Sequence, residues 1–139
     1  MPVIRDRADM IAGMNPALMP GLFQFCTVSD PAQIAAALPD ALGTFHEVEG
    51  LSLILPEAAA RALGLPLVGG LRQITLQVLS SLEGVGLTAA VASELAGHGI
   101  ACNMVAAYHH DHAFVPAADA ERAVGLLRAL ADKTAQDDV

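Results

Sequence analysis

Tryptophan is absent from this chain of 139 residues, and one tyrosine and four phenylalanines make up its remaining aromatic content. The apolar residues, 54% of the total, are therefore mostly alanine, leucine and valine. A chain of this length and composition suits one compact domain, or two small subdomains that share a core, with several buried helices and strands.

Basic residues are scarce as well, because seven lysines and arginines are scattered among fifteen acidic residues and the net charge is −8. Surfaces that bind nucleic acid or an anionic membrane need clustered basic side chains, so we expect neither partner. No apolar run is long enough to cross a membrane, and residues 1–16 lack the apolar core of a secretion signal. The expected location is the cytoplasm.

Cysteine occurs only twice, as Cys26 and Cys102, each within a predicted strand. In a cytoplasmic protein we expect both to be small buried residues rather than a disulfide. Phosphate-loop, dinucleotide and metalloprotease motifs are missing, and no serine or cysteine has an identifiable base. The sequence therefore predicts no catalytic residues, no cofactor and no enzyme.

Two similar units follow each other between residues 21 and 133. In the first, Asp30 as N-cap, Pro31 at the first helical position and Gly64 after a helix punctuate the chain. Apolar patterns predict strand, helix, strand, strand and helix over residues 22–28, 31–38, 44–48, 51–55 and 57–64.

The second unit repeats this order of elements. Ile74, Leu76 and Val78 alternate with polar residues, as on a strand with one buried face, and Gly97 ends a helix that begins at Leu87. The same five elements are predicted over residues 72–78, 87–96, 100–107, 112–115 and 117–131.

An internal echo supports the repeat, since LSLILPEAAARAL (51–63) resembles HDHAFVPAADAERAV (110–124), with Pro56 answering Pro116. Each βαββα half lacks the closing strand of a ferredoxin-like unit, so we predict that each borrows the other's first strand, 22–28 or 72–78. The predicted fold is α+β, with two intertwined ferredoxin-like units packed as one compact domain. Its parts are an irregular N-terminal arm with a short helical turn, two subdomains and a disordered tail, over residues 1–20, 21–70, 71–133 and 134–139.

The loop over residues 80–86, before the helix of the second unit, carries Gly84 and Gly86. It delivers backbone N–H groups to a helix start, where unpaired donors and partial positive charge suit a carboxylate or another anion. The plainer interpretation is a tight turn in which Ser80 or Ser81 caps a backbone group.

Four segments together resemble a known family, the ACT-like small-molecule-binding domains. They are GLFQFCTV (21–28), EGLSLILP (49–56), RQITLQVLSSLEGVGLTAAV (72–91) and IACNMVAAYHHDHAFVP (100–116). The resemblance covers roughly residues 18–131 and is greatest to small bacterial tandem-ACT proteins with an atypical N-terminal ACT subdomain.

The resemblance implies paired ferredoxin-like units that bind an amino acid or similar metabolite at an interface between ACT units. In the first unit the corresponding loop, residues 29–31, is short and lacks glycine, so no site is expected there. In the second unit the implied ligand-binding residues are Ser81, Glu83, Gly84, Val85, Gly86, Leu87, Asn103, Met104 and Asp111.

A second candidate site is the turn that contains His109, His110, Asp111 and His112, all of them types that bind zinc, nickel or copper. Neighbours on a strand point to opposite faces, so at most His110 and His112 share a side. A solvated hairpin turn is the plainer interpretation.

We therefore predict a non-catalytic regulatory or sensor protein, a homodimer, that binds a small metabolite. The alternatives are a protein-interaction module with no ligand and a metal-binding protein that uses the histidine turn.

Overall fold

The computed structural model describes residues 3, 6–79 and 84–137. The chain divides into two compact units: unit 1 comprises Met1–Pro20 and Arg72–Val139, and unit 2 comprises Gly21–Leu71. The N-terminal segment, predicted as an arm outside both repeats, thus belongs with the C-terminal half of the chain.

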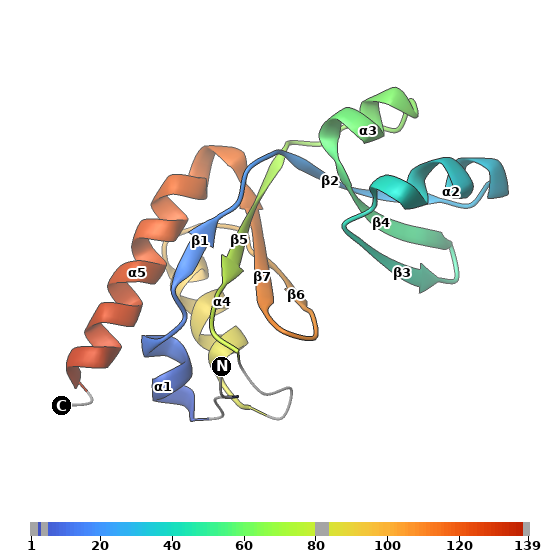
Figure 1. Cartoon of the computed structure of the whole chain (residues 1–139). Helices are drawn as coiled ribbons and strands as arrows, with labels where there is room; N and C mark the ends of the chain where they lie inside the picture. Colours follow the sequence, from blue (N-terminus) through green and yellow to red (C-terminus); the bar gives the residue numbers. More distant parts are fainter. Residues whose placement is uncertain (1–2, 4–5, 80–83, 138–139) are drawn as a thin grey trace. The chain divides into compact units, whose positions relative to one another are not determined.

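Unit 2 contains the predicted βαββα order. Its elements are β2 (Phe23–Val28), α2 (Pro31–Ala37), the 3-10 turn η1 (Leu38–Asp40), β3 (Gly43–Glu47), β4 (Gly50–Pro56) and α3 (Glu57–Ala62). The strands are antiparallel in the order β3-β4-β2, and Phe23 also pairs with Leu71 (Figure 1). Asp30 caps α2 as predicted, because its carboxylate accepts from Gln33 N at 3.1 Å.

The core of unit 2 lies between its helices and one face of its sheet. Three of its residues, Ala37, Leu55 and Ala60, are fully buried. The buried residues of this core are Val28, Ala37, Leu51, Leu53, Leu55 and Ala60. Alternation along β4 places three of these leucines on the same face, as expected for a strand with one buried side.

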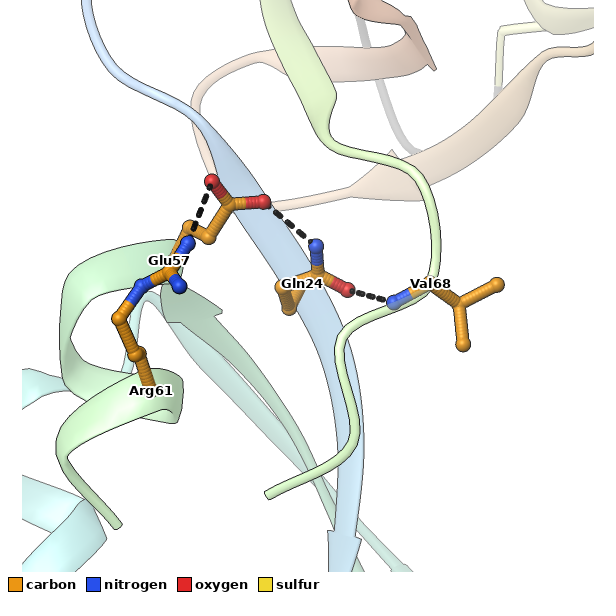
Figure 2. Close-up of polar contacts among 4 residues, drawn as sticks. All are labelled: Gln24, Glu57, Arg61 and Val68. Atoms are coloured by element: carbon orange, nitrogen blue, oxygen red, sulfur yellow. Dashed lines mark hydrogen bonds and ion pairs between the residues drawn. The ribbon is translucent and has the colours of Figure 1, made fainter. Parts of the chain in front are cut away.

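A buried amide joins three segments of unit 2 (Figure 2). Gln24, 3% exposed on β2, donates to Glu57 Oε1 at 2.7 Å and accepts from Val68 N at 3.0 Å. Arg61 Nη2 lies 3.9 Å from the other Glu57 oxygen, but its side chain is largely exposed, so this pair contributes little. The amide therefore fixes the segment after α3 against β2.

Gln24→Leu should lower the free energy of unfolding by about 1–3 kcal/mol, because it leaves a carboxylate and a backbone N–H without their partner. Urea denaturation measures the change. Thr27→Val, on an exposed position of the same strand, is the control and should shift stability by less than about 0.5 kcal/mol. Equal stabilities of Gln24→Leu and wild type would show that the amide is not a structural tie.

Unit 1 contains the second βαββα repeat and an added N-terminal helix and strand. Its elements are α1 (Arg7–Ala12), β1 (Pro16–Leu18), β5 (Leu71–Leu76), α4 (Leu87–Gly97), β6 (Asn103–Ala106), β7 (Asp111–Pro116), η2 (Ala117–Asp119) and α5 (Ala120–Asp137). The strand order is β1-β5-β7-β6 (Figure 1).

The strand that closes the sheet of unit 1 is β1, not the predicted 22–28. Pro16, Ala17 and Leu18 pair antiparallel with Leu76, Thr75 and Ile74. In unit 2, by contrast, the pairing of β5 with β2 is limited, among the residues that the structure describes, to Leu71 opposite Phe23. The predicted borrowing of 22–28 is therefore wrong, because the residues immediately before that strand already occupy the free edge of β5.

Helices α1, α4 and α5 contact one another, and α5 also contacts β1 and β7. Met10, Ile11 and Met14 from the predicted arm are at most 2% exposed and belong to the same core as Leu95 and Leu127. Asp6 caps α1 by accepting from Asp9 N at 3.0 Å. The arm is therefore an integral part of unit 1.

Helix α5 extends through Asp137, beyond the predicted boundary at residue 133. The predicted disordered tail is helical over its described part. Residues 135–137 lie on an exposed helix surface, and their polar composition is what suggested disorder. Within the described residues, none of the helices combines the length and apolarity needed to span a membrane.

Candidate functional site

The predicted ligand loop lies between β5 and α4 of unit 1. Ser81 and Glu83 lie outside the described residues, whereas the segment from Gly84 to Leu87 is described. Gly86 is the N-cap of α4 and has a φ of 108°, a left-handed conformation that favours glycine.

No side chain in the described part of the chain caps the start of α4, and its first turn contains no acidic residue. The first N–H groups of a helix have no intrahelical partner and carry partial positive charge. This helix start therefore offers donors that a carboxylate can accept from.

Arg7, in α1, lies directly against Gly86. A Cβ built on Gly86 would stand 2.7 Å from Arg7 Cδ and 2.9 Å from Arg7 Nε. Valine at this position would push the flexible Arg7 side chain aside and would strain the left-handed backbone. Gly86→Val would thus distort the start of α4, so it is a poor probe of ligand binding.

Asp111 lies at the same end of the sheet as this loop. It begins β7, and its neighbour His110 places Nδ1 3.4 Å from the carbonyl oxygen of Val78, at the end of the segment that leads into the loop. Burial raises the pKa of the Asp111 carboxyl, and the nearby imidazoles of His112 and His110 partly offset that rise. The partly buried carboxyl can meet a cationic group at this end.

Asp111→Asn should raise the free energy of unfolding near pH 7 by a few tenths of a kcal/mol, since the site remains partly solvated. Because the pKa of Asp111 is raised on folding, the folded protein binds the carboxyl proton more tightly than the unfolded chain does. The free energy of unfolding therefore falls as pH rises above the ordinary carboxyl pKa. Asparagine removes that loss. The gain should disappear near pH 4, and urea denaturation at both pH values measures it. A gain of equal size at both would contradict this account.

Asn103 and Met104 lie at the opposite end of β6. Asn103 pairs with Phe114, whereas Ala106, three residues later, pairs with Asp111, which is a separation of about 10 Å along a strand. Met104 packs against the helix-covered core, and alternation turns Asn103 to the other face. Within one chain, the structure does not bring these two residues to the loop.

The histidines of the predicted metal turn point to different partners. His112 Nδ1 lies 3.0 Å from Thr75 Oγ1 and 3.1 Å from Gln73 Nε2. His109, in contrast, packs edge-on against Tyr108 at 4.9 Å between ring centres. Among the residues that the structure describes, no three His, Cys, Asp or Glu side chains are placed to hold a metal ion.

His112 is instead part of a polar network on the sheet of unit 1. Gln73 donates to Thr75 Oγ1 at 3.1 Å, and we assign the Thr75 hydroxyl proton to His112 Nδ1, which leaves the ring proton on Nε2. Burial lowers the pKa of His112, His110 lowers it further, and Asp111 partly opposes both. The neutral imidazole is thus a structural member of the sheet face.

Sequence reasoning missed a hollow of about 340 Å³ in unit 2, between α2 and the β3–β4 hairpin. Its lining includes Val28, Ser29, Ile34, His46, Glu47 and Glu49. The acidic rim repels a carboxylate, whereas the start of α4 attracts one. The one sequence signal for this hollow is the pair Glu47 and Glu49, two residues apart on a predicted hairpin.

Comparison with family models finds the ACT domain twice, in residues 3–72 and in residues 70–129. No curated protein matches this chain.

Solved structures give further likenesses. A Vibrio cholerae protein of unknown function, described as a possible transport protein, is 39% identical, with a TM-score of 0.79 over 89% of this chain and 94% of its own. An Agrobacterium tumefaciens protein is 20% identical, with a TM-score of 0.63 over 84% and 87%. The ligand-free regulatory subunit of Thermus thermophilus aspartate kinase is 13% identical, with a TM-score of 0.57 over 83% and 95%. At such low identity the last two show the fold alone.

Proposed function

Because this chain belongs to the ACT-domain family, we propose that it is a non-catalytic sensor protein that binds an amino acid and passes that signal to a partner. Two ACT models match in tandem, and the fold is that of ACT regulatory domains. The ligand, the partner and a cytoplasmic location are parts of this proposal.

The observation that carries the proposal is the start of α4, where Gly86 is the N-cap and no side chain among the described residues caps the helix. Backbone N–H groups between Gly84 and Leu87 would hold the ligand carboxylate. Asp111, at the same end of the sheet, would hold the ligand ammonium group. The two halves of a zwitterion thus find opposite charges at one end of unit 1.

A homodimer completes this proposal. Strand β6 is at the edge of the sheet of unit 1, and edge strands are natural pairing surfaces. Because Asn103 is remote from the loop within one chain, it would contribute to a site only from a second copy. Ligand binding at such an interface would stabilise one arrangement of the assembly, which a partner could recognise.

A thermal-shift screen of the untagged protein against the amino acids, with EDTA present, tests the proposal. Binding stabilises the folded state by RT ln(1 + [L]/Kd), about 2.7 kcal/mol at a hundred times Kd. We expect one amino acid, or a few related ones, to raise the melting temperature, and EDTA to leave that rise unchanged.

Asp111→Asn should remove most of the rise, whereas Glu121→Gln, an exposed carboxylate on α5, should retain it. An absence of any rise at millimolar concentrations would reject the sensor proposal and favour an interaction module without a ligand. A rise only without EDTA would instead favour the metal-binding alternative.

A further inference from the structure

A groove of about 340 Å³ lies where three helices of unit 1 meet, away from the sheet. Helices α1, α4 and α5 contact one another and can be followed by their labels in Figure 1. Its lining includes Arg7, Ile11, Ala90, Glu94, Leu130 and Thr134, together with the exposed Ser93. Helix α1 is outside both βαββα repeats, so this groove is a feature of the added segment.

The groove has an apolar floor. Ile11 and Ala90 are 2% and 9% exposed, and Leu130 packs at the edge of the same core. Thr134 Oγ1 already donates to the carbonyl oxygen of Leu130 at 2.8 Å. The apolar part of a ligand would therefore pack on this floor, and its polar groups would bind the charged side chains that also line the groove.

Two opposite charges, Arg7 and Glu94, line the groove. Arg7 lies against Gly86 at the start of α4, and Glu94 is eight residues further along that helix, about 12 Å at a rise of 1.5 Å per residue. Within the described part of the chain, Glu94 has an ion-pair contact only with His98, whose Nδ1 is 3.8 Å from a carboxylate oxygen. Arg7 and Glu94 thus form separate positive and negative poles.

We propose that this groove is a second ligand site, which takes an extended zwitterion with its carboxylate at Arg7 and its cationic group at Glu94. A guanidinium presents a fork of donors to a carboxylate, and a carboxylate accepts strongly from an ammonium. A compact zwitterion such as glycine is too short to reach both poles. Both poles are partly solvated, so we expect a Kd on the order of 1 mM.

Isothermal titration of the full chain with ε-aminocaproate at low ionic strength tests this site. We expect saturable binding, and binding at least about tenfold weaker for hexanoate and for butylamine, each of which carries one of the two charged groups. Arg7→Gln and Glu94→Gln should each weaken ε-aminocaproate by at least about tenfold. Arg128→Gln and Glu121→Gln, exposed on α5, are the matched controls and should retain wild-type affinity.

Ser93→Phe gives a steric test, because this exposed position can hold a ring over the groove without disturbing the core. It should abolish binding while its circular dichroism and melting temperature remain those of wild type. Absence of saturable binding to wild type, or unchanged binding in Ser93→Phe, would overturn the proposal. Loss of binding in Asp111→Asn would also overturn it, since that result places the ligand at the loop end of the sheet.

Discussion

Deletion of residues 1–20 should abolish the cooperative folding of unit 1. The deletion removes β1, which closes the sheet beside β5, and with it the backbone pairing of Ile74 and Leu76. It also removes Met10, Ile11 and Met14, three almost completely buried side chains of the core. Truncating one such side chain to alanine typically costs about 2–5 kcal/mol, so loss of all three is comparable to the whole stability of an ordinary domain, even before the lost strand pairing is counted.

Limited proteolysis and amide NMR measure this effect. The deleted protein should lose dispersed signals throughout residues 72–137 and be cleaved within that region. Deletion of residues 135–139 is the matched control, because residues 135–137 are exposed at the end of α5, and it should leave the spectrum largely intact. A deleted protein with a native-like spectrum would show that the N-terminal segment is a dispensable arm after all.

Leu127→Ala should lower the free energy of unfolding of unit 1 by about 2–5 kcal/mol. Leu127 is fully buried on α5, in the core that also contains Leu95 and Val91. Its removal leaves a cavity that neighbouring helices and strands cannot fill without moving. Urea denaturation followed by hydrogen exchange identifies how much stability is lost and where.

Leu42→Ala is the matched control for this substitution. Leu42 is 50% exposed, so the same chemical change should alter stability by less than about 1 kcal/mol. Hydrogen exchange in Leu127→Ala should accelerate chiefly in unit 1, because unit 2 has a separate core. Equal acceleration in both units would contradict the existence of two independent cores.

The repeat could be predicted from the sequence because its signals are local. An Asp followed by Pro favours a helix start, and the observed cap of α2 by Asp30 matches that expectation. Pro56 and Pro116 also have nearly the same backbone, with φ and ψ of −53° and 137° in one and −54° and 137° in the other. Both repeats therefore pass from strand to helix in the same way.

The role of the N-terminal segment could not be predicted from local signals. A three-residue strand and a six-residue helix are too short to show a clear period, and Pro2, Pro16 and Pro20 suggested an irregular chain. What orders the segment is its partners, β5 and α5, more than fifty residues away in sequence. Contacts at such separation leave no mark in a short window of residues.

The candidate site was predictable in part for the same reason. Gly86 has a left-handed φ at the N-cap of α4, and this conformation favours glycine. The glycine in the sequence could therefore indicate a turn before the helix. Arg7 reaches Gly86 only through tertiary packing, and nothing near residue 7 indicates it. The placement of Asn103 and Met104 on opposite faces of β6 follows from strand alternation, which a transferred motif does not take into account.

Amide NMR during titration shows whether the loop end of unit 1 binds an amino acid. The probe is the amino acid that gives the largest thermal shift, or glutamate and lysine in turn if none does. We expect saturable shifts that cluster at the amides of Gly84–Leu87 and at Asp111, and that vanish in Asp111→Asn. Saturable shifts confined to other parts of the chain, or none at millimolar ligand, would contradict it.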